Sequence, residues 1–548
     1  MCFVHEKCVS LRDNCTAKTQ NMGIYIDKGN AGFSSCRNSE YVDKSGLIAV
    51  VNKTLNTEKR FCCVTRSRRF GKTMAAKMLL AYYDKSCDSR HLFADLEIAN
   101  DPSFEQHLNK YPVISIDIGF FVSKHKGKTV LEEMNTEIIK EVHDVYPDVP
   151  VQEGDDLMQY LVRASLSSGD RFIFIVDEWD AILRECGNMV YDEQRTVGDA
   201  YIDWLRRLFK GEPANQVFAG VYMTGILPIK KYKTQSALNN FIEYSMVTPG
   251  PMARYFGFTK QEVRLLAEKH GMDYEELEKW YDGYQIGSER SMFNPNSVME
   301  AIRNEWCENY WSKTGAYDAA ADYIDMNYEG LKDDVIALLA GERSIVDPAR
   351  FNNDMSEVRS RDDVLTLLIH LGYLTYDRRT QECFIPNMEV GKELENAIKV
   401  NKWQNVVGIL KQSRELLLAT LRGDADYVAR ALDAAHTEHT SILSYNDENS
   451  LACVISLAYY YARNDYHIHR EYPTGYGYAD LVLIPRKGVE GPALVIELKY
   501  NKDANAAISQ IKAKNYPAQV ADYASNLLLV GINYDRETKM HTCKIERP

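Results

Sequence analysis

The length, composition and charge of the chain exclude several classes of protein. It has 548 residues, of which 45% are hydrophobic and 26% charged, so we expect about three folded domains rather than a disordered chain. No stretch approaches the roughly 18 apolar residues that span a bilayer, which excludes an integral membrane protein. The formal net charge of −13 argues against a chain coated in positive charge for nucleic-acid binding, although such a sum can hide one basic domain.

The cysteines and the N-terminus indicate a reducing compartment. The 12 cysteines form no CxxC pair and no cluster with histidine at zinc spacing, so we expect reduced thiols. Residues 1–21 have neither the apolar core of a secretory signal nor the charge pattern of a transit peptide. We predict a tail there, with disorder left open, and a cytoplasmic protein.

Four apolar runs between residues 22 and 250 are typical of buried strands. They are separated by about 40–60 residues, which leaves room for the crossover helices that parallel strands require. We therefore predict a parallel α/β sheet in this part of the chain. The four runs are FCCVT (61–65), YPVISIDI (111–118), RFIFIVDE (171–178) and VFAGVYMTG (217–225).

The rest of the chain is predicted to form three further segments, which makes the protein α/β overall. Residues 251–330 are aromatic and helical in pattern, and we interpret them as a helical lid. Residues 331–437 have apolar residues at helical spacing and predict a helical connector. Residues 438–548 return to a mixed α/β pattern. The elements predicted in this last segment are helices over 448–463 and 503–515 and strands over 466–472, 478–484, 493–500 and 526–532.

A phosphate-binding loop is predicted where the first strand leads into a helix. Gly71, Lys72 and Thr73 stand at this junction, where backbone N–H groups and the helix start face phosphate, the lysine reaches the β/γ oxygens and the hydroxyl binds Mg²⁺. The general pattern has glycine at position 66, and this chain has Arg66. Taken alone, the motif is therefore equally compatible with a helix start that has a solvated basic face.

Three arginines directly precede this motif, at positions 66, 68 and 69. They could neutralise a triphosphate or face an acidic partner, and the residues alone leave both interpretations open.

A second acidic element strengthens the nucleotide interpretation. The strand FIFIVDEWD (172–180) ends in Asp177 and Glu178, where a carboxylate would ligate nucleotide-bound Mg²⁺ and the adjacent glutamate would orient or deprotonate water. Thr224 ends a further strand and is placed to present a hydroxyl near the γ-phosphate. A strand that simply runs into a polar turn remains the alternative for each.

A second candidate site lies near the C-terminus. Asp480 opens an apolar strand, and Glu497 and Lys499 are two residues apart on the next, so these two side chains share one face. Buried charges cost several kcal/mol unless paired or metal-bound, so the group predicts a Mg²⁺ site with a lysine beside it. An internal Glu–Lys salt bridge is the alternative. Glu448 and Gln510 are placed to complete the site, and Glu471 competes with Glu448 for that role.

These two clusters, taken with their flanking sequence, resemble a known pair of fused domains. The first resembles the AAA-ATPase-like domain, in which a YVDK box precedes a loop of the RPRRFGKS type, so Arg66 matches the family and Ser67 replaces the usual proline. The second resembles the PD-(D/E)XK nuclease-superfamily domain. The matching segments are YVDKSGLI (41–48), RSRRFGKT (66–73), FIFIVDEWD (172–180), TGILPIKKYKTQSALNNF (224–241), REYPTGYGYAD (470–480), IELK (496–499) and QIKAKNY (510–516).

The resemblance implies ATP binding and hydrolysis in the first domain and Mg²⁺-dependent phosphodiester cleavage in the last, with Mn²⁺ open as the nuclease metal. We expect Thr73 and Asp177 to ligate the nucleotide's metal, and Asp480 and Glu497 to ligate that of the nuclease. The nucleotide site is expected to comprise Arg68, Arg69, Phe70, Gly71, Lys72, Thr73, Asp177 and Thr224. The catalytic residues are expected to be Glu178 in the first domain and Glu448, Asp480, Glu497, Lys499 and Gln510 in the last.

Three functional hypotheses follow. The leading one is a nuclease under nucleotide control, with DNA favoured over RNA as partner and a homo-oligomer left open. The second is a nucleotide-switched protein that binds nucleic acid or acts as a scaffold without cutting. The third is an ATPase acting on a protein client, with the aromatic KWYDGY (279–284) and NYW (309–311) segments as client contacts, or simply as lid packing. Residues 466–548 have 11 basic and 9 acidic side chains, so the acidic total does not exclude nucleic-acid binding at the second site.

Overall fold

The chain forms two compact units in the computed structural model. One comprises residues 1–62, 73–224 and 238–242, and the other 63–72, 225–237 and 243–548. The predicted tail over 1–21 lies outside the described residues, and the five predicted segments remain a prediction. The structure describes residues 23–547 except 126, 128, 230–237, 312–323, 325–327, 329, 352–357, 401–403, 440–447, 474–477 and 514–525.

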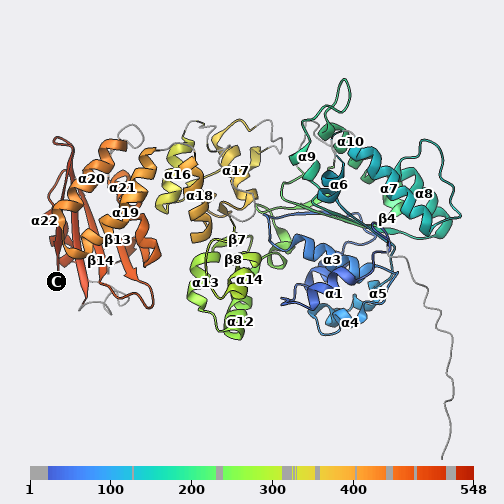
Figure 1. Cartoon of the computed structure of the whole chain (residues 1–548), viewed down its shortest axis with the longest axis horizontal. Coiled ribbons are helices and arrows are strands. Elements are labelled where there is room, and N and C mark those ends of the chain that lie inside the picture. Colours follow the sequence, from blue (N-terminus) through green and yellow to red (C-terminus); the bar gives the residue numbers. More distant parts are fainter. Residues whose placement is uncertain are drawn as a thin grey trace, which may run out of the picture. The chain divides into compact units, whose positions relative to one another are not determined.

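A five-stranded sheet of order β2-β3-β4-β1-β5 organises the N-terminal part of the chain (Figure 1). Pairing is parallel between β2 and β3 and between β3 and β4, as the crossover spacing predicts. Every residue of β1, β3 and β4 is buried, which explains why these strands are continuous apolar runs rather than alternating ones. The strands are β1 (Phe61–Thr65), β2 (Val113–Asp117), β3 (Phe172–Asp177), β4 (Phe218–Gly225) and β5 (Ile242–Tyr244).

Helices cover both faces of this sheet, with α1, α3, α4 and α5 on one side and α6 to α10 on the other (Figure 1). This is the layering expected of a parallel sheet, whose two faces are both apolar. The helices are α1 (Ala31–Arg37), α2 (Gly46–Asn52), α3 (Lys72–Tyr83), α4 (Arg90–Phe93), α5 (Phe104–His107), α6 (Ile118–Lys124), α7 (Thr129–Val145), α8 (Leu157–Ser168), α9 (Ala181–Glu185), α10 (Val197–Phe209) and α11 (Glu212–Val217).

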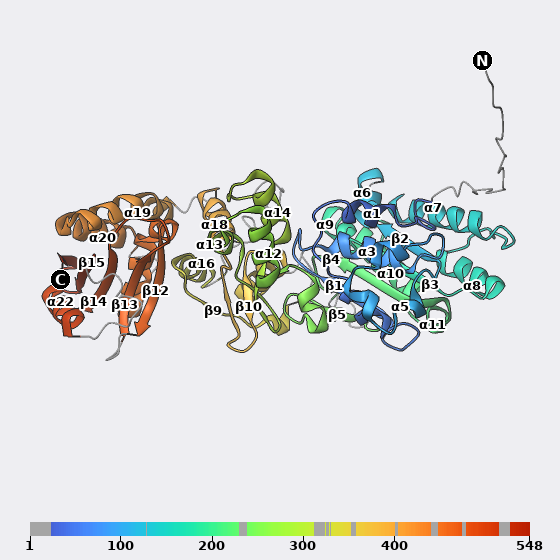
Figure 2. The same cartoon turned by 90° about the horizontal axis from the view of Figure 1, so that it is seen from below.

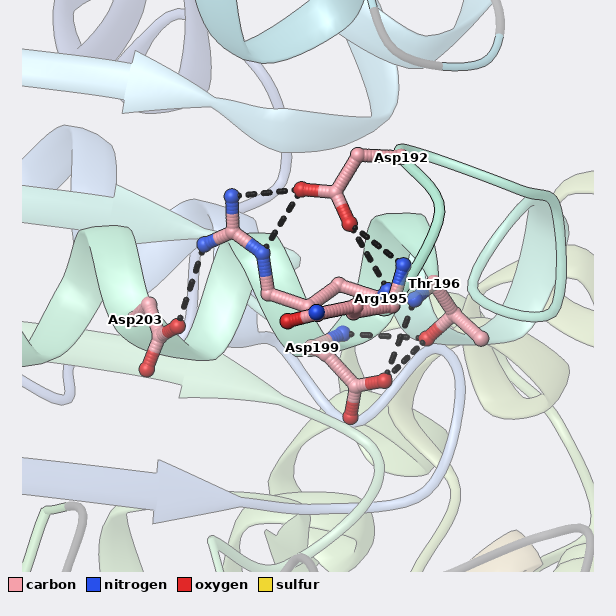
Figure 3. Close-up of polar contacts among 6 residues, drawn as sticks. Asp192, Arg195, Thr196, Asp199 and Asp203 are labelled. Carbon is pink, nitrogen blue, oxygen red and sulfur yellow. Dashed lines mark hydrogen bonds and ion pairs between the residues drawn. The ribbon is translucent and has the colours of Figure 1, made fainter.

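The start of α10 is fixed by local polar contacts (Figure 3). Thr196 and Asp199 form a capping box, in which the Asp199 amide donates to Thr196 Oγ1 at 3.2 Å and the Thr196 amide donates to Asp199 Oδ2 at 3.1 Å. Arg195 pairs with Asp192 at 2.7 Å and with Asp203 at 3.4 Å. These contacts define where the chain turns back into the helix after β3 and α9.

The segments predicted as lid and connector contain small antiparallel sheets as well as helices. One sheet has the order β6-β8-β7 and the other β10-β11-β9. Strands of two to five residues are too short to show a hydrophobic period, so the sequence pattern did not indicate them. The elements are β6 (Phe258–Thr259), α12 (Lys260–His270), α13 (Tyr274–Tyr281), β7 (Tyr284–Ile286), β8 (Glu289–Phe293), α14 (Pro295–Asn304), α16 (Leu331–Ala340), β9 (Ser344–Ile345), α17 (Arg361–Leu371), β10 (Thr375–Asp377), β11 (Glu382–Phe384), α18 (Met388–Val400), α19 (Gln404–Arg422) and α20 (Ala425–His439).

The C-terminal part is a mixed sheet of order β12-β13-β14-β15-β16, parallel only between β14 and β15. Helices α19 and α20 lie on one side of the sheet and α22 on the other (Figure 2). All four predicted strands are present, and β16, whose residues are mostly polar, was not predicted. The elements are α21 (Glu448–Ala458), β12 (Tyr466–Pro473), β13 (Tyr478–Pro485), β14 (Ala493–Tyr500), α22 (Ala504–Ala513), β15 (Leu527–Asp535) and β16 (Met540–Glu546).

No helix among the described residues is long and apolar enough to cross a bilayer.

A buried glutamate on α18 ties the aromatic segment after α14 to the connector. Glu389 has no exposed surface, and its Oε1 accepts from the amides of Tyr310 at 2.9 Å and Trp311 at 3.1 Å. Its Oε2 accepts from Ser297 Oγ at 2.9 Å. Burial raises the pKa of Glu389 to about 7, against the lowering effect of these hydrogen bonds, and the neighbouring Glu393 raises it further.

We predict that Glu389→Gln flattens the dependence of stability on pH. The folded chain keeps a proton on Glu389 up to a pKa of about 7, whereas the unfolded chain releases it near 4.3. The free energy of unfolding should therefore fall as pH rises through this window, by about 4 kcal/mol, and a glutamine should lack this loss. Urea unfolding of both proteins between pH 4.5 and 8, followed by tryptophan fluorescence, measures the difference. Parallel curves for the two proteins would contradict the prediction.

Candidate functional site

The loop after β1 closes around its own lysine. The Lys72 ammonium, on a residue that is 8% exposed, donates to the carbonyls of Arg66 at 3.0 Å and Ser67 at 2.8 Å. Arg69 and Gly71 have left-handed backbone with φ of 67° and 89°, and alternation of this kind turns successive N–H groups toward one concavity that suits an anion. This backbone is compatible with the predicted cradle, which stays a prediction.

Two other side chains of the loop are structural. Arg66 is fully buried, donates to the carbonyls of Thr65 at 2.8 Å and Tyr244 at 2.9 Å, and lies 5.2 Å from the Phe256 ring centroid. The sequence left two roles open for the Arg66 guanidinium, contact with a triphosphate and contact with an acidic partner. Its burial fits neither role. Phe70 is also fully buried in the core, so only its backbone is available to the predicted nucleotide.

The remaining residues predicted for the loop are more accessible. Arg68 is half-buried, Arg69 is exposed, and Thr73 is exposed in the first turn of α3. Lys72 and the end of β3 fall in different compact units.

The edge where β2 and β3 end has two carboxylates. Asp177 is 6% exposed and accepts from the amide of Glu178 at 3.0 Å. Asp117 is its register partner at the end of β2. Asp117 was not among the predicted site residues, although the predicted strand YPVISIDI (111–118) has this acid near its end, as the next strand has Asp177.

Glu178 is held in an unusual position. Its backbone is left-handed with φ of 51°, and its Oε2 lies 3.3 Å from Arg184 Nη2. The Arg184 Nε also pairs at 3.2 Å with Asp180, whose side chain is fully buried. A Cβ at Gly119 would lie 2.9 Å from Glu178 Oε2, so a larger residue there would require the Glu178 carboxylate to shift. Neither Arg184 nor Gly119 has a sequence signal, because their roles depend on tertiary contact.

Two further polar groups belong to this part of the sheet. Thr224 is fully buried, its carbonyl accepts from the Trp179 amide at 3.0 Å, and its Oγ1 has no hydrogen-bond partner among the described residues. Lys28 donates to the Ser115 carbonyl at 3.3 Å. Burial lowers the pKa of Lys28, an effect opposed by Asp117, Glu141 and Asp177.

The second cluster brings four predicted residues together on the α22 side of the C-terminal sheet. Lys499 Nζ donates to Glu497 Oε1 at 3.1 Å and to the Leu498 carbonyl at 2.9 Å. Gln510 on α22 donates from Nε2 to the same Glu497 oxygen. The Glu497 and Lys499 side chains are 1% and 8% exposed, so this ion pair is buried.

Asp480 is next to this pair. Its Oδ2 accepts from the Leu498 amide at 2.7 Å. Strands β13 and β14 pair up to Leu481 and Ile496, so Asp480 and Glu497 are the next residues on neighbouring strands.

Glu448 and Glu471 were the two candidates to complete this site, and the structure describes the side chain of Glu471 alone. Glu471 on β12 lies between pairs that flank Asp480, is exposed and has φ of 45°. Glu448 begins α21, and its side chain is outside the described part.

The residues present at this cluster fit a hard divalent cation. Carboxylate oxygens from two adjacent strands are the ligands that Mg²⁺ and Mn²⁺ prefer. Both Asp480 and Glu497 are also oriented by neighbouring donors, as ligating carboxylates usually are.

Comparison with known proteins gives two separate domain matches. A family model described as predicted AAA-ATPase matches residues 31–234. A model of the PD-(D/E)XK nuclease superfamily matches residues 446–543.

A curated protein is similar to this chain over nearly its full length. The "Uncharacterized protein in vnfD 5'region" of Azotobacter chroococcum mcd 1 is 22% identical over 532 residues, which cover 91% of this chain and 93% of that protein.

Solved structures give a weaker likeness. The Aeropyrum pernix ORC2 protein (ADPNP–ADP complexes) is 12% identical with a TM-score of 0.31 and covers 67% of this chain and 97% of its own. The Aeropyrum pernix ORC1 protein in complex with DNA is 13% identical with a TM-score of 0.24 and covers 66% of this chain and 94% of its own. TM-scores this low carry no inference. Residues 31–234 thus match a predicted AAA-ATPase domain and residues 446–543 a PD-(D/E)XK nuclease-superfamily domain, which is the fusion that the sequence motifs predict.

Proposed function

We propose that the chain binds and hydrolyses ATP in its N-terminal domain and cleaves nucleic-acid phosphodiesters in its C-terminal domain, in a reaction that depends on Mg²⁺ or Mn²⁺. The observation that supports cleavage best is the convergence of Asp480, Glu497, Lys499 and Gln510 within a domain of the nuclease superfamily. DNA is the proposed substrate, ahead of RNA. The proposed compartment is the cytoplasm.

The chemistry of the cutting site follows from its side chains. A divalent ion held by Asp480 and Glu497 would supply a water nucleophile of lowered pKa and polarise the phosphate. Lys499 supplies a fixed ammonium for the negative charge that develops on the phosphate oxygens. Gln510 and the Lys499 ammonium both contact Glu497, so they also hold that carboxylate in place.

In the proposed ATP site, the loop lysine exchanges its partners. Lys72 donates to two loop carbonyls in this structure, and we propose that the β/γ phosphates replace them. Thr73 and Asp177 would hold the nucleotide's Mg²⁺, and Thr224 would meet the γ-phosphate. Glu178 would orient the attacking water once Arg184 releases its carboxylate.

Nucleotide control of cutting has a physical route in the packing of the loop. A Cβ at Gly372, which follows α17, would lie 2.6 Å from the Cβ of Ser67, so the loop and connector are in direct contact. Tyr284 packs edge-on against Phe70 at 4.9 Å and donates to the Gly372 carbonyl at 3.0 Å. The same apolar core continues from Phe70 through the connector to the C-terminal sheet. We propose that this contact couples the nucleotide site to the C-terminal domain.

Action on a protein client receives less support from the structure. The aromatic side chains proposed as client contacts, Trp280, Tyr281, Tyr310 and Trp311, are 7% exposed or less. Their burial favours a packing role for these aromatic side chains over contact with a client.

We predict that Lys499→Ala lowers DNA cleavage by about 100-fold or more while ATP binding is unchanged, because one fixed charge next to a transition state contributes a factor of this size. Lys502→Ala is the matched control, since Lys502 is exposed two residues after β14. The measurement is cleavage of single- and double-stranded DNA and RNA with Mg²⁺ or Mn²⁺, with and without ATP. Equal activity of the Lys499 variant and the control would exclude the proposed site.

We predict that Lys72→Ala weakens ATP binding by at least about tenfold and abolishes ATP turnover, because its ammonium would meet the β/γ phosphates. Lys77→Ala on the exposed face of α3 is the control and should behave as the wild type. Binding of a fluorescent ATP analogue and release of phosphate are the measurements. Cleavage by the Lys72 variant that no longer responds to ATP would support nucleotide control, and an unchanged response would exclude it.

A further inference from the structure

The edge strand of the C-terminal sheet has a row of aromatic side chains that neither domain match explains. Strand β12 is at the edge of the sheet, next to β13 (Figure 2). His467 and His469 are exposed on it, and Tyr472 is half-buried. The two exposed histidines are not needed to hold the fold together, since the opposite face of β12 packs into the core through Ile468.

This row faces the same side of the sheet as the candidate cutting site. His469 pairs with Val482 on β13, which pairs with Val495 on β14. Directly paired residues share a face of a sheet, and so do residues two apart on one strand. Glu497 and Lys499 follow Val495 at these intervals, so His467, His469 and the cluster lie on one face.

The rings are arranged as one continuous surface. The imidazoles of His467 and His469 have centroids 6.4 Å apart and are inclined by 25°, so they are nearly parallel. This separation is nearly twice the rise of 3.4 Å between bases in one strand of a duplex. The ring of Tyr472 follows at 5.4 Å from His469 and packs against the apolar cluster that includes Val482 and residues of α22.

The charge state of the two imidazoles favours stacking over ion pairing. Partial burial lowers the pKa of both His467 and His469 below 6.5. Arg486 and Lys279 lower the pKa of His467 as well, and Glu278 opposes them. At neutral pH both rings are therefore mainly neutral, and they offer a flat aromatic face rather than a positive charge for phosphate.

We propose that His467, His469 and Tyr472 form a stacking surface that holds unpaired bases of the strand entering the cutting site. Aromatic rings and imidazoles are the groups on which proteins stack splayed bases. This inference rests on the proposed function and narrows its substrate to nucleic acid with a single-stranded segment at the cleavage point.

The test is binding of a labelled single-stranded DNA oligonucleotide and of the same sequence as a duplex, measured by fluorescence anisotropy with Ca²⁺ in place of Mg²⁺. His467→Ala with His469→Ala should weaken single-strand binding by about tenfold or more, since stacked bases contribute that much. His467→Phe with His469→Phe keeps the rings and should stay within about threefold of the wild type. His91→Ala, which removes an exposed histidine on α4, is the control.

Each result bears on one claim. Equal losses in the alanine and phenylalanine variants would overturn stacking, because the imidazole nitrogens rather than the rings would then be needed. Unchanged binding in the alanine variant, or an equal loss for the duplex, would overturn the proposal while wild-type cleavage leaves the nuclease function intact. A wild type that neither binds nor cleaves any of these substrates would overturn both.

Discussion

The buried ion pair between Glu497 and Lys499 is the constraint on which the C-terminal domain depends. Transfer of two charges into an apolar sheet costs several kcal/mol per ion unless each is paired and hydrogen-bonded. The pair meets this condition through its own contact, the Leu498 carbonyl and Gln510. A Cβ at Gly531 on β15 would lie 2.5 Å from the Ala504 carbonyl, so the absence of a side chain there lets α22 approach the sheet. This close packing of α22 places Gln510 in contact with Glu497.

The loop after β1, which we propose binds phosphate, also depends on buried side chains for its position. Arg66 and Phe70 do not face a ligand, but they bind the loop to the lid by hydrogen bonds and ring contacts. A change in the loop when nucleotide binds therefore has to be accommodated by the packing around Tyr284 and Gly372. Arg66 stands where the general loop pattern has glycine, and this difference therefore has a structural explanation rather than a catalytic one.

Much of the fold was readable in the sequence where segments are long and wholly buried. The apolar runs predict the strands that lead to Asp177 and Thr224 and those that contain Asp480 and Glu497, and strands lie at these places. A buried strand allows only apolar residues on both faces, so it produces such a run in the sequence. Short strands in the lid and connector and the polar edge strand β16 have no such signature. Asp117 was within reach of the same reasoning, since it ends an apolar run of the same kind.

Residues whose roles depend on tertiary contact could not be predicted. Arg184 and Gly119 reach Glu178 only after helices α6 and α9 have packed together. His467 and His469 alternate on a short strand in a pattern common to any exposed edge, and only the register with β13 and β14 places them on the face of Glu497.

Anomalous diffraction from crystals of the full chain soaked in Mn²⁺ is the most direct test of the proposed metal-dependent cutting site. We expect one ion with carboxylate oxygens of both Asp480 and Glu497 at about 2.1 Å, with Lys499 still in contact with Glu497. A clear map in which the ion binds elsewhere, or in which no ion binds while the Glu497–Lys499 pair is intact, would contradict a metal-dependent cutting site and leave the cluster as a structural ion pair.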